Sequence, residues 1–134
     1  MPPFHFQSIA EVAEQLRTRR LSPVELTEHM LARISEVDGR LRSYATVMEA
    51  PARAQAAEAE REIASGRYRG PLHGVPIAVK DLCFTRGVPT MGGTSVLRDH
   101  IPSFDGTAVT RLGAAGAVLL GKLNLTEGAM GGYN

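Results

Sequence analysis

The strongest constraint in this sequence is the uneven placement of its glycines. Of the fourteen glycines, only Gly39 and Gly66 precede Gly70, so twelve lie from Gly70 onward. Glycine adopts backbone conformations closed to other residues and weakens helices, so the two parts must fold differently. We therefore predict a helical N-terminal part over residues 1–66 and the start of an α/β core over residues 67–134.

The first part carries clear helix signals. Ser8–Glu11 has the spacing of a capping box, and Ser22–Glu25 places a proline at the first position of a second helix, which should end near Gly39. Residues 44–48 are β-branched and aromatic in part, which favours a short strand. The Ala, Glu and Arg of residues 52–65 predict a third helix.

The second part alternates strand and helix signals. Residues 75–79 predict a buried strand, in which Pro76 is tolerable only at the start or on a sheet edge. A helix should follow, capped by Asp105 or Thr107, and residues 117–120 predict a further buried strand. The order strand, helix, strand indicates an α/β domain with N-terminal helices and a mixed, largely parallel sheet.

Bulk composition excludes several functional classes. A chain of 134 residues is long enough for a single domain with a real core. A net charge of +1, with scattered basic residues, argues against nucleic acid as a partner. The lone Cys83 permits no internal disulfide and no metal site built on cysteine pairs. No leader and no apolar run of about 18 residues occurs, so we expect a soluble, cytoplasmic protein without a membrane partner, metal or cofactor.

The two lysines, Lys80 and Lys122, are the residues whose chemistry needs explaining. Each directly follows an apolar run instead of lying on a polar helix face. A lysine at the end of a strand is ordinarily a solvated terminator. Burial, by contrast, lowers the pKa of a lysine amine and supplies a neutral base or nucleophile. The local pattern alone favours the solvated interpretation for both.

Other reactive side chains give weaker signals. Cys83 could be drawn as a nucleophile, but a lone cysteine is more often a small buried apolar residue. His73 and His100 lack a second ligand or base at useful spacing. Residues 77–80 match the strand lysine of protein kinases only superficially, because no Gly-x-Gly-x-x-Gly loop precedes them. The loop hydroxyls are typical of turn hydrogen bonding: Thr90, Thr94, Ser95 and Ser103.

Three segments resemble the amidase signature family of serine amidohydrolases. They are Gly70–Asp81, with the sequence GPLHGVPIAVKD, then Asp105–Ala117 and Val118–Glu127. The paired N-terminal helices with Ser22–Leu26 are also similar to the opening of that family. The likeness follows the family's order along nearly the whole chain.

The resemblance implies a serine amidase mechanism. In that family a serine attacks an amide carbonyl, assisted by a second serine on a cis peptide and by a lysine, and Lys80 matches the lysine. The loop containing Met130 and Gly131 resembles the border of the family's pocket for a small amide substrate. No Gly-Gly-Ser-Ser-Gly-like region occurs in the chain. The resemblance thus implies a single, truncated amidase signature domain over residues 1–134, inactive alone.

Two alternatives stay open. The chain could belong to the amidase subunit of a tRNA-dependent amidotransferase, which releases ammonia for a partner subunit. It could also be a non-catalytic remnant that keeps the helices and some strands but performs no chemistry. The sequence leaves the amide and any homo-oligomeric assembly undetermined.

Overall fold

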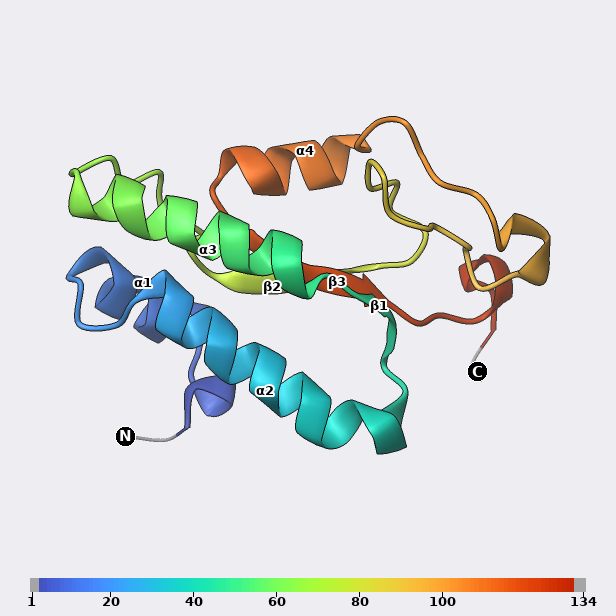
Figure 1. Cartoon of the computed structure of the whole chain (residues 1–134), viewed down its shortest axis with the longest axis horizontal. Helices are drawn as coiled ribbons and strands as arrows, with labels where there is room; N and C mark the ends of the chain where they lie inside the picture. Colours follow the sequence, from blue (N-terminus) through green and yellow to red (C-terminus); the bar gives the residue numbers. More distant parts are fainter. Residues whose placement is uncertain (1–2, 132–134) are drawn as a thin grey trace.

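The computed structural model describes residues 3–131, which form a three-stranded sheet with helices around it (Figure 1). The α-helices are α1 (Ile9–Arg17), α2 (Pro23–Leu41), α3 (Glu49–Ala64) and α4 (Thr107–Ala114). The strands are β1 (Tyr44–Val47), β2 (Pro76–Lys80) and β3 (Val118–Leu123). Short 3-10 turns are η1 (Phe4–Phe6), η2 (Ser95–Leu97) and η3 (Glu127–Ala129). The predicted fold class, N-terminal helices together with part of a mixed α/β sheet, is confirmed.

The two expected helix starts are both present. The Ser8 hydroxyl accepts a hydrogen bond from the Glu11 N–H, and the Glu11 carboxylate accepts one from the Ser8 N–H, which completes the capping box. The Ser22 hydroxyl caps α2 with Pro23 at its first position. The expected end near Gly39 was two residues short, because the helix continues until Arg42 turns left-handed with φ of 50°.

β3 is the central strand, and the sheet order is β1-β3-β2. β2 pairs with β3 in parallel and β1 pairs with β3 antiparallel, which confirms a mixed sheet. Pro76 is the first residue of an edge strand, where its missing donor leaves no ladder bond unmade.

The start of α4 differs from the expectation. Gly106 is the N-cap and makes no side-chain bond to the helix. Asp105 does not cap the helix because its carboxylate accepts a hydrogen bond from the Arg86 N–H at 2.7 Å. Thr107 is already the first helical residue. The acid therefore holds the preceding loop against α4 instead of starting the helix.

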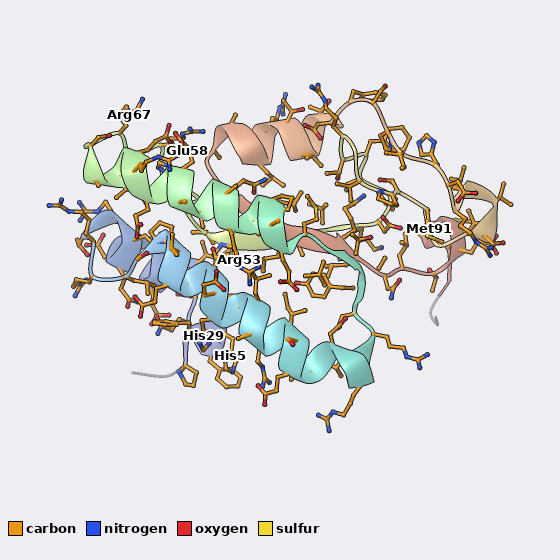
Figure 2. All side chains as sticks on the ribbon, in the orientation of Figure 1. His5, His29, Arg53, Glu58, Arg67 and Met91 are labelled. Atoms are coloured by element: carbon orange, nitrogen blue, oxygen red, sulfur yellow. The ribbon has the colours of Figure 1, made fainter. Side chains whose placement is uncertain are left out.

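The core forms on both faces of the sheet. One apolar cluster joins α1 and α2 to the start of β2 through Leu16, Leu26 and Val75. On the other side, α4 packs over Val79 and Leu119. Figure 1 shows α4 on one side of the strands and α1 and α2 on the other. Arg53 of α3 forms an ion pair with Glu28 of α2 at 2.7 Å, and Figure 2 shows it between these helices.

α3 runs along the edge of β3 that β1 leaves open. β1 pairs only with residues 121–123 of β3, so no strand within residues 3–131 pairs with the first half of β3 on that side. The Gln55 side-chain oxygen accepts a hydrogen bond from the Leu119 N–H at 2.7 Å, and the Met48 N–H donates to the Leu120 carbonyl at 2.7 Å. These bonds satisfy backbone groups that would otherwise be buried without partners. The helix thus replaces the missing strand.

Gly121 is the point at which β1 and β3 approach most closely. A Cβ atom at this position would lie 2.2 Å from the Thr46 carbonyl oxygen. We expect G121A to lower the free energy of unfolding by about 1–3 kcal/mol, because a rigid backbone group must move. G39A is the matched control: Gly39 is helical with no atom within 4 Å, so alanine should raise the stability by roughly 0.5–1 kcal/mol. Urea unfolding of both variants tests this, and equal effects of the two substitutions would contradict it.

Candidate active site

Lys80 is the last residue of β2, and its side chain is exposed. Its backbone is fixed on both sides: the Cys83 N–H donates to the Lys80 carbonyl at 2.9 Å, and the following residue, Asp81, donates its N–H to the Leu123 carbonyl at 2.9 Å. A lysine at the carboxyl end of a strand in a partly parallel sheet lies where α/β proteins place their ligands. The backbone at Lys80 is therefore held in place, while its side-chain amine is accessible to a substrate or to another catalytic group.

The prediction that Lys122 is a solvated lysine is wrong. It lies inside β3 and is 0% exposed. Its Nζ donates a hydrogen bond to the Thr90 hydroxyl at 2.7 Å and lies 3.3 Å from Asp81 Oδ1. Asp81 and Thr90 are also buried. No local signal indicated the partners of Lys122, because Asp81 follows β2 and Thr90 lies in a loop, and only the fold brings them to β3.

The two lysines should differ sharply in reactivity. Acetic anhydride in limiting amounts should acetylate Lys80 in the native 134-residue chain and leave Lys122 unmodified, because only the first amine is accessible. The chain contains no other lysine, so peptide mapping by mass spectrometry resolves both sites. In urea the two should react alike. Equal acetylation under native conditions would contradict the burial of Lys122.

The loop predicted to border the substrate pocket lies near the end of β2. Met130 follows η3 and is 82% exposed, and Gly131 is exposed with φ of 117°. The Gly92 N–H donates to the Asp81 carbonyl, and the Gly128 N–H donates to the Gly92 carbonyl, each at 2.9 Å. This chain of two hydrogen bonds connects the loop to the residue after Lys80. The neighbouring Gly132 lies outside the described residues.

The weaker candidates fall into structural positions. Cys83 is half-buried and packs against the apolar cluster beneath α4, as expected of a lone cysteine. The Thr94 hydroxyl accepts a bond from the Val96 N–H and so stabilises a turn. His100 lies with its ring centroid 5.2 Å from that of Phe84. None of these side chains makes a described contact with Lys80.

His73 belongs to a buried polar cluster at the end of α3. Its Nδ1 accepts a hydrogen bond from the Arg69 N–H at 3.1 Å, so the neutral ring carries its proton on Nε2. That atom lies 3.1 Å from Glu62 Oε2 but makes no hydrogen bond to it. Burial lowers the pKa of His73, Arg69 lowers it further, and Glu62 opposes both. The hydrogen bond from Arg69 lowers the pKa of Glu62.

These shifts predict a loss of stability in acid. Because the pKa of folded His73 lies below its ordinary 6.5, the unfolded chain binds more protons between the two values. The free energy of unfolding should therefore fall as the pH drops from about 7 through 6, and Glu62 adds a loss in the same direction at lower pH. In H73Q the free energy of unfolding should depend less steeply on pH between about pH 7 and pH 6. Urea titrations at several pH values measure it, and an unchanged slope in H73Q would contradict the assignment.

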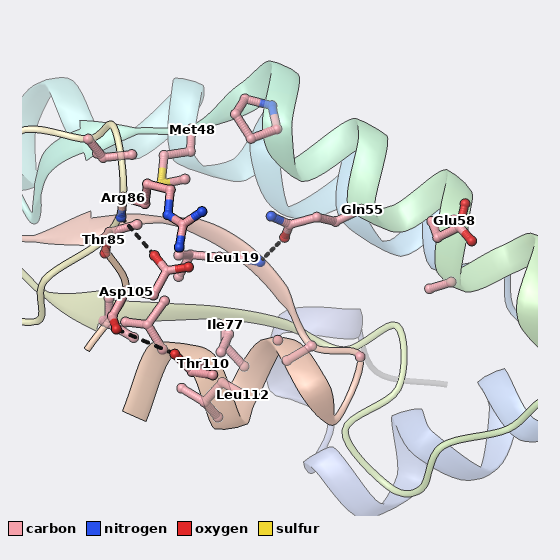
Figure 3. Close-up of a pocket in the computed structure, with 18 of the residues that line it drawn as sticks. Met48, Gln55, Glu58, Ile77, Thr85, Arg86, Asp105, Thr110, Leu112 and Leu119 are labelled. Carbon is pink, nitrogen blue, oxygen red and sulfur yellow. Dashed lines mark hydrogen bonds between the residues drawn. The ribbon is translucent and has the colours of Figure 1, made fainter. Parts of the chain in front are cut away.

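A cleft of about 660 Å³ lies between α3 and α4 (Figure 3). Its lining includes the apolar residues Met48, Ile77 and Leu119 and the charged residues Arg86 and Asp105, which Figure 3 shows beside each other. Lys80 does not line this cleft. Because successive residues of a strand project to opposite faces, Val79 faces the cleft and Lys80 faces away from it. The cleft and the predicted catalytic lysine are therefore separate features.

Two further properties bear on the function. Within residues 3–131, no three His, Cys, Asp or Glu side chains are arranged to hold a metal ion. None of the helices in this described part is long and apolar enough to cross a membrane.

Helices packed on a mixed sheet, with a lysine at the end of a parallel strand, define an α/β protein with a candidate site at a strand end. A family model described as Amidase matches residues 25–134. The chain therefore belongs to the amidase family.

Individual relatives agree with this assignment. The chain is 53% identical over 126 residues to "Putative amidase AmiD" of Mycobacterium tuberculosis, covering 94% of the chain and 26% of that protein. It is 45% identical to a glutamyl-tRNA(Gln) amidotransferase subunit of Anaeromyxobacter dehalogenans, with the same coverage. The solved peptide amidase of Stenotrophomonas maltophilia superposes with a TM-score of 0.87 at 37% identity, covering 93% of the chain and 26% of that structure. The chain thus spans about a quarter of the length of these proteins.

Proposed function

We propose that this chain supplies the catalytic lysine, Lys80, of a serine amidase that hydrolyses the carbon–nitrogen bond of a small amide. The observation that carries the proposal is the position of Lys80: an accessible amine on a rigid strand end, within the motif that resembles the amidase signature. Membership of the amidase family supports the reaction class. The high identity to a protein named as an amidase supports it independently.

In the proposed mechanism Lys80 acts as the general base. Its amine takes the proton of a bridging serine hydroxyl, which in turn takes the proton of the nucleophilic serine. The serine oxygen adds to the amide carbonyl carbon, and the carbon–nitrogen bond breaks as Lys80 returns that proton, through the bridging serine, to the leaving nitrogen. Water then hydrolyses the acyl-serine ester. Both serines belong, in this proposal, to a part of the domain outside residues 1–134.

The loop at Met130 and Gly131 borders the substrate in this proposal. Its hydrogen-bonded connection through Gly92 to Asp81 keeps it beside the strand end that carries the base. Glycine-rich loops can direct backbone N–H groups at a developing oxyanion, which is the stabilisation that a tetrahedral intermediate requires.

The test compares two proteins on simple amides. One is the 134-residue chain, and the other is the extended protein, meaning these residues followed by the downstream sequence that the gene encodes. The extended protein should hydrolyse the amide and be inactivated by a serine-directed reagent, whereas the 134-residue chain should be inactive. Robust serine-type hydrolysis by the short chain would overturn the division of the catalytic groups. A gene that stops after residue 134 would favour the non-catalytic alternative.

A second candidate is the amidase subunit of a tRNA-dependent amidotransferase. It is favoured by the 45% identity to a relative that carries that name. In that case the extended protein should copurify with partner subunits and hydrolyse glutamine. Rapid turnover of simple amides by the isolated extended protein, without glutaminase activity, would favour the independent amidase.

A further inference from the structure

Three buried polar groups meet directly beneath the strand end that carries Lys80. They are Lys122, Asp81 and Thr90, which are exposed by 0%, 2% and 2%. The Lys122 amine donates to the Thr90 hydroxyl at 2.7 Å and lies 3.3 Å from Asp81 Oδ1. The proposed amidase mechanism uses none of them. A buried ion pair is costly to desolvate, and an apolar trio of similar volume is often at least as stable, so stability alone does not require this cluster.

Asp81 is the member of the cluster that controls the local backbone. Its Oδ2 accepts a hydrogen bond from the Met91 N–H at 3.0 Å, and its carbonyl accepts one from the Gly92 N–H at 2.9 Å. Its own N–H donates to the Leu123 carbonyl. These bonds fix the peptide that follows Lys80. They also hold the residue 91–92 loop, to which the Gly128 N–H is bonded.

The register keeps Lys122 away from the amine that it supports. Lys80 pairs with Leu123 and Val79 pairs with Lys122. Paired residues project to the same face and successive residues alternate, so the two lysines project to opposite faces. Lys122 therefore acts from the interior and does not compete for the substrate.

We propose that Lys122 is a positioning residue for Lys80, holding the Asp81 carboxylate and the Thr90 hydroxyl so that the strand end and the Gly92 loop keep one arrangement. The inference rests on the proposed amidase function. A displacement of about 1 Å in a catalytic group can cost a factor on the order of 100 in rate, so a positioning role should appear in kcat. KM should stay unchanged, because the cluster does not touch the substrate.

The test uses the extended protein and measures kcat and KM on a simple amide. K122M should lower kcat about 100-fold with KM unchanged. T90V removes one hydrogen-bond acceptor for the Lys122 amine and should lower kcat roughly 5-fold, which is the rate factor that corresponds to the free energy of one hydrogen bond. T90S keeps the hydroxyl and should restore kcat. L16A, in the α1–α2 core, destabilises the protein without touching this cluster. Its kcat should equal the wild-type value at a temperature where every variant is folded.

The outcomes separate the two proposals. If K80M retains full activity, the proposed function itself fails. If K80M is inactive but T90V and K122M keep the wild-type kcat, only the positioning role fails. If K122M does not fold, the T90V and T90S pair decides: a loss in the first and recovery in the second supports the role, and wild-type kcat in both overturns it. A decrease in L16A equal to that in K122M would also overturn it, because general destabilisation would then explain the rate.

Discussion

Replacing Lys80 by methionine should lower kcat for amide hydrolysis by the extended protein about 10³-fold, because a general base contributes on the order of 10²–10⁴ in rate. K80R should be equally inactive, since a guanidinium remains protonated and cannot accept the serine proton. Steady-state kinetics on a simple amide measures the effect.

The matched control is R98M, which removes a basic side chain from an exposed position in the segment between β2 and α4. Its kcat should stay within about two-fold of the wild type, as expected for a surface substitution away from the reacting groups. Activity in K80M above about a tenth of the wild-type value would remove Lys80 from the mechanism. An equal loss of kcat in R98M would attribute the effect to the removal of any positive charge and not to the position of Lys80.

The second large effect concerns stability. K122M should lower the free energy of unfolding by about 3–5 kcal/mol, because it leaves the Asp81 carboxylate buried without its partner. Urea unfolding, followed by far-UV circular dichroism, measures the change. The physical reason is the desolvation of the Asp81 carboxylate, which is buried and would lose its charged partner.

The double variant D81N/K122M isolates that cause. With both charges removed, much of the lost stability should return, since a neutral pair carries no desolvation cost of this size. D81N alone should be destabilised in the manner of K122M, because it leaves the Lys122 amine unpaired. Additive losses in the double variant would show that the two residues do not act as a pair.

Local sequence signals predicted those features of the fold that depend on interactions between residues close together in the sequence. The capping hydroxyls of Ser8 and Ser22 bond to backbone donors three residues away or fewer, so their spacing is visible in the sequence. Pro76 restricted its position to the start of a strand or a sheet edge for the same reason, since its missing donor does not depend on distant residues, and it is the first residue of β2. The predicted cap by Asp105 or Thr107 was wrong: the N-cap is Gly106, and the Asp105 carboxylate instead accepts a hydrogen bond from the Arg86 N–H, nineteen residues away.

The candidate site likewise combines a residue that its own sequence motif indicates with residues whose surroundings depend on distant parts of the chain. Lys80 was recognisable from its motif, the structure places it exposed at the end of β2, and its catalytic role stays a proposal. The buried state of Lys122 depends on Asp81 and Thr90, which are 41 and 32 residues away. A hint was present in the sequence: Lys122 closes an uninterrupted run of small and apolar residues from Gly116 to Gly121, which is typical of a buried strand. Nothing local could supply the partners that make such burial tolerable.

The most direct test of the central claim, that Lys80 activates a serine, is the rate at which a fluorophosphonate labels the extended protein. In this reaction the serine oxygen displaces fluoride from phosphorus, so the rate reports activation of the nucleophile without amide cleavage. We predict labelling of one serine in the wild type, outside residues 1–134, and a rate in K80M lower by about the same factor as kcat. Equal labelling rates in the wild type and K80M, or amide hydrolysis that persists with no labelled serine, would contradict the account.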